Sequence, residues 1–302
     1  MSTSDAASIA PSSYPLYQVS KGFPDGKGDI TLLTVDNVIF HVHRAILQHS
    51  SAVFETIFEA GDAKDEEDEP TKQQLKFEAD AATLDLLLRH IYQNHCSPRI
   101  EDVDQLASVF RAAKRYEMEG VFDQLRRSLL EMRITRRKVV SPLYIRYPFA
   151  ILAITYAFEL YEEARLALRE CMKGDMKAHM EGASNFDVPV PLMNTIISLR
   201  ESRANWFKSK LDGIPWPSTN CIYCYRKCAE WRCQLERNVM SKLDFEVVRR
   251  ELAKPERCEN GHDPSQLVPA GTLSAWSDEW KKMQEVLPEL PEDSFDRLLA
   301  RH

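Results

Sequence analysis

The stretch from Gly28 to Gly61, GDITLLTVDNVIFHVHRAILQHSSAVFETIFEAG, constrains the fold most, because its hydrophobic pattern changes period within it. Apolar and polar residues alternate over residues 30–36, and residues 38–42 form a second β-prone run after an Asp-Asn pair typical of turns. A Ser-Ser pair at residues 50–51 can cap a helix, and apolar residues then recur at helical spacing until the final glycine. The stretch therefore predicts a β-hairpin followed by a helix.

Several residues of this stretch form a second pattern through their fixed offsets. They are an acid before the first strand, two residues at the end of the hairpin and four in the helical part: Asp29, Phe40, His43, Leu47, Ser50, Phe54 and Phe58. The pattern resembles the opening of a BTB/POZ domain, which usually runs Asp-hydrophobic, Phe-x-x-His-Lys, Leu, Ser-x-x-Phe. In that family these positions fix the sheet and the first helices of a protein-interaction module. The resemblance implies that the residues build a docking platform and that the role is scaffolding.

Further elements follow this opening. Residues 75–79 alternate as a short third strand, and residues 81–94, 102–115 and 118–132 carry apolar residues at helical spacing. The last two helices resemble the closing helical pair of the family. We therefore expect an α+β fold, mostly α, in which a small β-sheet flanked by helices is followed by an all-α C-terminal region. The expected parts are a disordered tail at 1–24, a BTB/POZ domain at 25–135 and the helical region at 141–302.

Prolines mark the boundary near residue 140. Pro142 and Pro148 disfavour helical geometry at the residues before them, and Pro148 suits the first position of a new helix. The basic cluster at residues 133–138 fits a solvated helix end better than a nuclear import signal, because Ile134 and Thr135 interrupt it. The following half resembles, in its position and its Cys and Trp content, the C-terminal region of mushroom-type fungal BTB proteins.

Charge and hydropathy exclude several classes of function. A net charge of -7 and a pI near 5.7 give no basic surface for nucleic acid. The most apolar segment, 147–158, has only 12 residues between charged neighbours, whereas a membrane helix needs roughly 20. Residues 1–15 lack the apolar core of a secretory signal. We expect no nucleic-acid partner, no membrane, and a cytoplasmic and/or nuclear location.

The cysteines suggest a metal site. A Cys-x2-Cys pair and a Cys-x3-His pair lie about 33 residues apart within segment 218–265, and two such pairs can supply the tetrahedral ligands of zinc. The expected ligands of one structural zinc are Cys221, Cys224, Cys258 and His262. Four protein ligands leave no position for a substrate. Cys228 and Cys233 could enter an alternative ligand set, or could be small buried residues on a helix.

No pattern in the sequence argues for catalysis. His41 and His43 share one face of a strand, but no third ligand accompanies them. His90, His95 and Cys96 lie near a helix end without an orienting group or an oxyanion-forming turn, which favours surface residues. We expect no enzyme, and no cofactor besides the zinc.

The resemblance implies a homodimer that also binds unidentified proteins. Within that class, a substrate adaptor of a cullin-type ubiquitin ligase is possible, although its usual hydrophobic-x-Glu motif is replaced by Ala63-Lys64-Asp65. Ala63 can bury only a methyl group, about 1 kcal/mol against up to about 3 for Leu. The alternative class is a BTB-containing transcription regulator that binds DNA or chromatin partners. The acids Glu230 and Glu236 among the basic residues of the cysteine region disfavour it.

Overall fold

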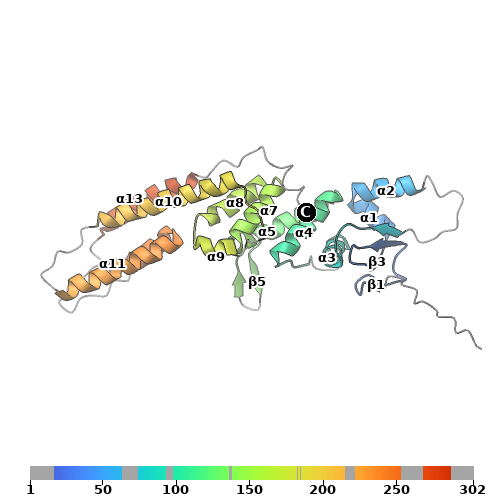
Figure 1. The fold of residues 1–302 in the computed structure, drawn as a ribbon, viewed down its shortest axis with the longest axis horizontal. Coiled ribbons are helices and arrows are strands. Elements are labelled where there is room, and N and C mark those ends of the chain that lie inside the picture. The colour runs from blue at the N-terminus through green and yellow to red at the C-terminus, as the bar shows by residue number, and fades with distance from the viewer. Residues whose placement is uncertain are drawn as a thin grey trace, which may run out of the picture. The chain divides into compact units, whose positions relative to one another are not determined.

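The protein is represented by a computed structural model (Figure 1), which describes residues 17–62, 74–92, 98–135, 138–181, 183, 185–214, 222–252 and 268–286. The chain divides into two compact units, residues 1–127 and residues 128–302. The first unit combines one small sheet with helices, and the second is helical apart from a two-stranded hairpin. The expected α+β class with an all-α C-terminal region is therefore confirmed.

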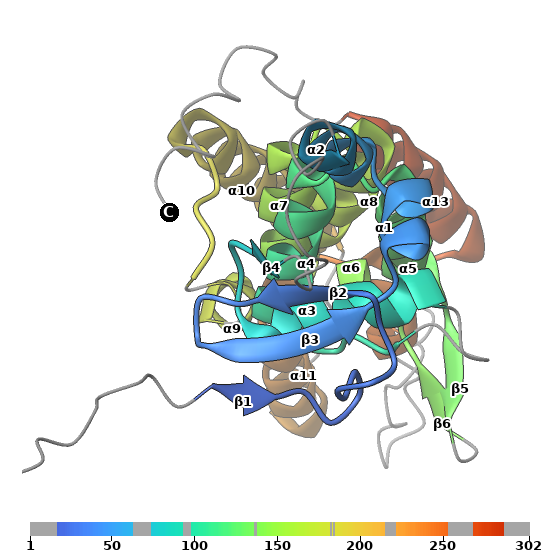
Figure 2. The ribbon, with the colours of Figure 1, turned by 90° about the vertical axis from the view of Figure 1, so that its right-hand side faces the viewer.

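The first unit is built on a four-stranded mixed sheet with the order β1-β3-β2-β4. In Figure 2, β1 lies beside β3 at one edge of this sheet. The central strands form the predicted antiparallel hairpin, and its turn places Asn37 at a φ of 59°, a left-handed conformation that Asn tolerates well. The outer strands each run parallel to their neighbour. The strands are β1 (Gln18–Val19), β2 (Ile30–Leu33), β3 (Val38–Val42) and β4 (Gln74–Lys76).

Helices complete the first unit, and an aromatic stack lies in its core. The Tyr116 ring stacks between the rings of Phe54 and Phe77, with centroid distances of 5.1 and 4.5 Å. The stack joins three elements far apart in sequence, because Phe54 lies in a helix, Phe77 follows β4, and Tyr116 ends α4. The helices are α1 (Arg44–Ser50), α2 (Ala52–Asp62), α3 (Ala81–Tyr92), α4 (Val103–Arg115) and α5 (Glu119–Leu130).

The start of the chain differs from the expected disordered tail at 1–24. Residues 17–24 are described, and the backbone N–H groups of Gln18 and Ser20 donate to the carbonyl oxygens of Asn37 and Ile39 at 3.2 and 2.8 Å. These bonds form β1, whose two residues are too few to show an alternating pattern in the sequence. Residues 1–16 lie outside the described part of the chain.

The basic cluster at residues 133–138 is not a helix end. It lies in an antiparallel hairpin of β5 (Arg133–Thr135) and β6 (Lys138–Val140), in which Ile134 is opposite Val139. The physical reason is the β-branched residues around the cluster, which lose side-chain freedom in a helix and pack well in strands.

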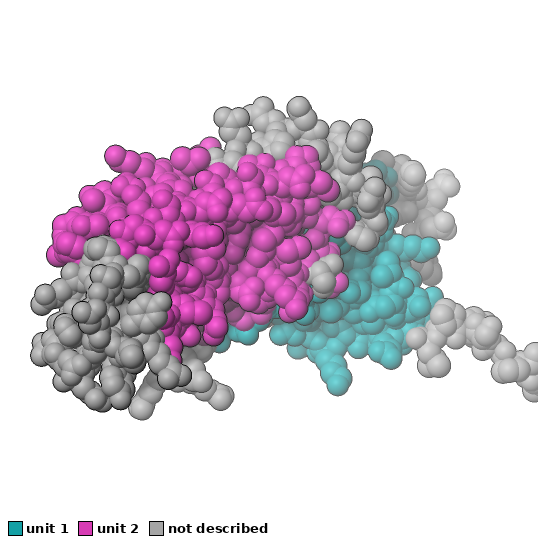
Figure 3. Space-filling view, turned by 60° about the vertical axis from the view of Figure 1, so that its left-hand side comes forward, with its two compact units in different colours: residues 1–127 teal, residues 128–302 magenta. Residues whose placement is uncertain are grey.

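The second unit, magenta in Figure 3, contains a helix that is buried over almost its whole length. Every residue from Pro148 to Tyr156 is buried, and Pro148 occupies the first turn of this helix, as its sequence position predicts. Among the described helices, none is both long and apolar enough to span a bilayer. The helices of this unit are α6 (Leu143–Arg146), α7 (Pro148–Ala157), α8 (Tyr161–Cys171), α9 (Met176–Glu181), α10 (Val190–Asp212), α11 (Ile222–Lys242), α12 (Phe245–Leu252) and α13 (Ala270–Glu285).

A buried arginine joins the helices of the second unit. The Arg200 guanidinium in α10 donates to the carbonyl oxygens of Cys171, Lys173 and Gly174 at 2.8, 3.0 and 2.7 Å, so it caps the C-terminal end of α8. The N–H of Gly174, whose φ is 68°, donates to the carbonyl oxygen of Lys242 at 2.7 Å. The end of α8 is therefore fixed to the end of α11.

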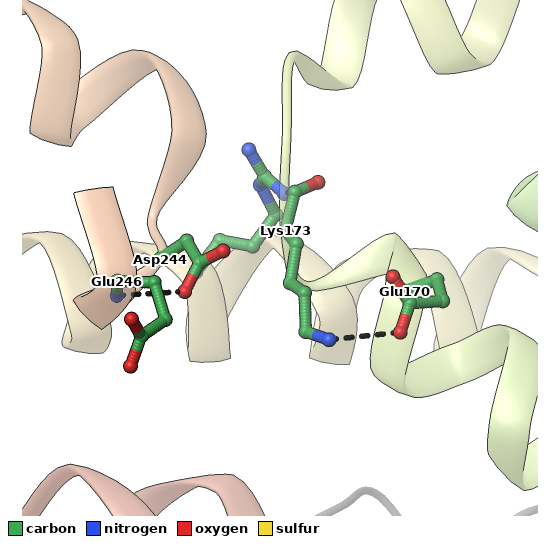
Figure 4. Close-up of polar contacts among 5 residues, drawn as sticks. Glu170, Lys173, Asp244 and Glu246 are labelled. Carbon is green, nitrogen blue, oxygen red and sulfur yellow. Dashed lines mark hydrogen bonds and ion pairs between the residues drawn. The ribbon is translucent and has the colours of Figure 1, made fainter. Parts of the chain in front are cut away.

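Helix α11 ends at Lys242, and α12 begins at Phe245 (Figure 4). The sequence pattern between the two cysteine pairs predicts one long helix over residues 226–251, but Leu243 has a φ of 45° and α11 ends before it at Lys242. The Asp244 carboxylate then accepts from the N–H of Glu246 at 3.1 Å, which caps α12. Lys173, just beyond the end of α8, pairs with Glu170 of that helix at 2.8 Å.

Candidate functional site

Two residues of the predicted signature, Asp29 and His43, meet at the start of α1. His43 occupies the N-cap position but makes no side-chain cap of its own. Instead, the Asp29 carboxylate, from the residue before β2, accepts a hydrogen bond from the N–H of Arg44 at 2.8 Å. A carboxylate at a helix N-terminus satisfies an otherwise free amide and opposes the positive end of the helix dipole. Asp29 therefore fixes where α1 leaves the hairpin.

Tyr92, the last residue of α3, holds the same junction from the other side. Its hydroxyl oxygen accepts a hydrogen bond from the backbone N–H of His43 at 2.7 Å and lies 3.2 Å from the His43 Nδ1. Burial raises the pKa of the Tyr92 hydroxyl, and the negative charge of Asp29 adds to this rise, while the bond from His43 opposes it. The Phe23 ring meets the Tyr92 ring edge-on at 5.2 Å.

Arg44 links the first two helices to each other. Its guanidinium lies 4.9 Å from the centre of the Phe58 ring and donates to the Phe58 carbonyl oxygen at 3.0 Å. A cation over an aromatic face is stabilised by the ring quadrupole. Helices α1 and α2 are therefore held together by the contact between Arg44, the residue after His43, and the signature residue Phe58.

The seven signature residues divide into core and surface positions. Four are buried with at most 2 % exposure, Phe40, Leu47, Phe54 and Phe58, so they shape the domain and cannot themselves touch a partner. Asp29 and His43 are exposed, and Ser50 is half-buried. That these residues build a docking platform stays a prediction, and within it only the exposed positions can make direct contact.

Of the two serines at the start of α2, the second is the cap. The Ser51 hydroxyl oxygen accepts from the N–H of Phe54 at 3.1 Å, and the hydroxyl donates to the Tyr116 carbonyl oxygen. The Ser50 hydroxyl instead donates to the Ile46 carbonyl oxygen within α1, at 2.8 Å. Tyr92 is the structural residue that the signature leaves out, whereas Arg44 stands at the Lys position of the family pattern and Ser51 directly follows its Ser position. Ser51 was visible as a capping residue, whereas the partner of Tyr92 is 49 residues away.

The edge strand β1 offers a surface for pairing. The Tyr17 and Val19 side chains are 46 % and 48 % exposed. Because Gln18 and Ser20 use their N–H groups on β3, strand geometry directs the N–H and C=O of Val19 towards the open edge. On α2, Ile57 is 36 % exposed, and the following Ala63-Lys64-Asp65 lies outside the described residues.

His90 is not the surface residue that its position near a helix end suggests. It is 3 % exposed, and its Nδ1 lies 3.0 Å from the Gln124 Oε1 on α5. Burial lowers the pKa of the His90 imidazole, against the opposing effect of this hydrogen bond. The physical reason is that His90 follows Leu87 by three residues and so lies beside the apolar face of α3. His95 and Cys96 lie outside the described residues.

The predicted zinc ligands fall largely outside the described structure. Cys221, Cys258 and His262 are not among the described residues, and Cys224 lies in α11 with its side chain undescribed. Within the described ranges, no group of three or more His, Cys, Asp or Glu residues could hold a metal ion. Cys233 is a free, exposed cysteine. The zinc site stays a prediction.

Comparison with known proteins identifies the first unit. The family model of the BTB/POZ domain matches residues 27–133, which include the four-stranded sheet from β2 onward and helices α1 to α5. A search of curated proteins found no match to the chain. BTB domains are generally non-catalytic modules that commonly self-associate and bind other proteins. Residues 27–133 therefore form a BTB/POZ domain, the family that the opening of the sequence resembles.

Proposed function

We propose that the chain is a non-enzymatic scaffold whose BTB domain joins two copies of the chain through the edge strand β1. The observation that supports this proposal is that β1 has no second neighbouring strand among the described residues and carries exposed Val19, next to exposed Tyr17. The general role, a protein–protein interaction module, follows from the family.

An open sheet edge attracts pairing strands, because its N–H and C=O groups need partners. Soluble proteins usually protect such an edge with charges, prolines or a covering helix. β1 itself consists of Gln18 and Val19, which carry no charge, and Tyr17 before it is also apolar in its ring. The two residues of β1 therefore carry neither the charge nor the proline that commonly protects such an edge.

A second copy fits this edge because it offers the same strand. Two identical strands can pair across a two-fold axis, so that each Val19 meets the edge of the other copy in an isologous contact. Pairing would cover the two exposed side chains and satisfy the free backbone groups at once.

The test is the mass of the purified full chain by light scattering. We expect a dimer for the native sequence, and a shift to monomer for Val19→Lys, because a charge at the centre of the paired edge opposes burial. The matched control is Val35→Lys, another exposed valine of the same unit, at 66 % exposure, next to the hairpin turn.

Two results would contradict the proposal. One is a monomeric native chain at all concentrations tested. The other is a dimer that Val19→Lys and Val35→Lys weaken equally, because β1 would then have no special role. Helical circular dichroism of both variants shows whether the domain remains folded.

A further inference from the structure

The β5–β6 hairpin stands apart from the helices of the second unit. Arg133 is opposite Val140 and Thr135 is opposite Lys138, so the two strands pair over three residues each. Neither strand packs extensively on a described helix, and in Figures 1 and 2 the hairpin extends away from α7 and α8. A two-stranded hairpin is at best marginally stable in water unless a third strand or a helix covers it. Among the described residues, this hairpin has no such cover.

The register gives the hairpin two chemically different sides. Residues that are opposite each other, or two apart on one strand, lie on the same side of a sheet. Ile134 and Val139 therefore share one side, which Met132 continues two residues before Ile134. Met132 and Val139 are 68 % and 63 % exposed. Exposed apolar side chains that gather on one face are typical of an interaction surface. We call this the apolar side.

The opposite side of the hairpin carries positive charge. The register places Arg133 and Lys138 on it, together with half-buried Val140. From Arg133 to Lys138, four of the six residues are Arg or Lys and none is acidic. Residues 136–137, which join the strands, lie outside the described residues. We call the side with Arg133 and Lys138 the cationic side.

Both outer edges of the hairpin are open within the described part of the chain. The sheet consists of β5 and β6, so each strand has one described neighbour. In an antiparallel pair, about half of the backbone N–H and C=O groups point away from the neighbouring strand. An extended peptide satisfies such groups when it adds a strand, and its side chains then alternate between the two sides of the sheet. A strand bound here would place every second residue on the apolar side and the others on the cationic side.

We propose that the β5–β6 hairpin binds an extended segment of another protein in which acidic and apolar residues alternate. The acidic residues lie beside Arg133 and Lys138, and the apolar residues cover Met132 and Val139. Charge complementarity of this kind speeds the encounter and suppresses binding of wrong partners. The inference concerns β5 and β6 alone and does not rest on pairing through β1.

Two other occupants fit the hairpin less well. A second copy of the hairpin would bring its own Arg133 and Lys138 to the same side of the joined sheet, and like charges on neighbouring strands are destabilising. Nucleic acid fits the cationic side but leaves exposed Met132 and Val139 uncovered, and the net charge of -7 on the chain repels its phosphates.

The probe is a synthetic peptide of alternating glutamate and valine with a fluorescent label, about eight residues long so that it spans one strand. A block peptide of the same composition, with all glutamates before all valines, keeps the charge and loses the alternation. Fluorescence anisotropy with the full chain measures both. We expect the block peptide to bind about tenfold more weakly or less, because it cannot match both sides of a sheet. Hydrogen exchange of residues 133–140 should slow only with the alternating peptide.

Charge reversal tests the cationic side. Arg133→Glu combined with Lys138→Glu should weaken binding of the alternating peptide by about tenfold or more, because attraction becomes repulsion. The same variant should gain binding of a peptide in which lysine replaces glutamate, which requires an intact hairpin. The matched control combines Lys177→Glu with Lys208→Glu at exposed positions of α9 and α10. It makes the same change of net charge and should bind within about twofold of native protein.

Four results overturn the proposal. The first is no binding of the alternating peptide by native protein at about 1 mM. The second is equal binding of the alternating and block peptides, which would show attraction by charge alone. The third is a charge-reversed variant that fails to gain binding of the lysine peptide. The fourth is tighter binding of random duplex DNA than of the alternating peptide, which would assign the hairpin to nucleic acid.

Discussion

The backbone N–H of His43 donates a hydrogen bond of 2.7 Å to the hydroxyl oxygen of Tyr92, which connects the start of α1 to the last residue of α3. The two residues are 49 positions apart in the sequence. The bond therefore holds the start of α1 against the end of α3 and sets the direction in which α1 leaves the hairpin.

Replacement of Tyr92 by Phe tests this connection. The ring remains against Phe23, but the His43 N–H loses its acceptor. We expect a loss of about 1–2 kcal/mol in the free energy of unfolding, measured with urea. Tyr17→Phe, at an exposed position, is the control and should leave the unfolding midpoint unchanged. Equal midpoints for Tyr92→Phe and native protein would contradict the role of the bond.

Gly28 offers a second test of the junction, because it lies directly against β3. A Cβ atom at this position would be 2.4 Å from both the backbone N and the backbone O of Val42. Backbone atoms in a hairpin cannot move aside, so Gly28→Ala should destabilise the domain by about 1–3 kcal/mol. Gly120→Ala in α5 is the matched control, since nothing lies within 4 Å of its added Cβ.

Gly120→Ala should be neutral or stabilise the domain by up to about 1 kcal/mol, because alanine favours a helix over glycine. Thermal unfolding of both variants measures the difference. Similar effects from the two substitutions would show that the close approach of Gly28 to Val42 does not limit the domain.

Metal removal tests the predicted zinc site at Cys221, Cys224, Cys258 and His262. Structural zinc contributes directly to folding free energy, so a chelator should lower the melting temperature and the helical circular dichroism signal. Elemental analysis of the purified chain should give about one zinc per chain. Cys233→Ser, at an exposed free cysteine, should leave that ratio unchanged. A zinc content near zero would contradict the site.

The local sequence pattern was sufficient to predict much of the secondary structure of the BTB domain. The alternation at Ile30 and Leu32 predicted the hairpin, because residues two apart in a strand lie on the same face. The stripe from Leu84 to Leu88 predicted α3 for the corresponding helical reason. β1 had no such signal, because two residues cannot show a period. Its hydrogen bonds go to the carbonyl oxygens of Asn37 and Ile39, about 19 residues further along the chain.

Tertiary contacts decided the features that the pattern missed. Leu243 is a helix-forming residue type, yet α11 ends there while the Lys242 carbonyl oxygen accepts from the distant N–H of Gly174. That Ser51 and not Ser50 caps the helix likewise depends on Tyr116, whose carbonyl oxygen accepts a hydrogen bond from the Ser51 hydroxyl. Neither partner can be inferred from spacing along the chain.

His90 should make the stability of the BTB domain depend on pH. Burial lowers the pKa of its imidazole in the folded protein below the ordinary 6.5, so the folded state favours the neutral ring. Well above pH 6.5 the imidazole is neutral in both states and the contribution is constant. As the pH falls through that value, the unfolded chain binds the proton first, and the free energy of unfolding decreases.

Urea unfolding of native protein and of His90→Gln between pH 5 and pH 8 measures this dependence. Glutamine keeps a hydrogen-bonding group near the Gln124 Oε1 and cannot take up a proton in this range. We expect a shallower decrease towards pH 5 for His90→Gln, while His49→Gln, at an exposed position, keeps the native slope. The residual slope of His90→Gln should include His179, whose pKa burial and Arg200 also lower. Parallel curves for native protein and His90→Gln would exclude His90 as the group responsible, because removal of a group that binds its proton more readily in the unfolded chain must change the slope.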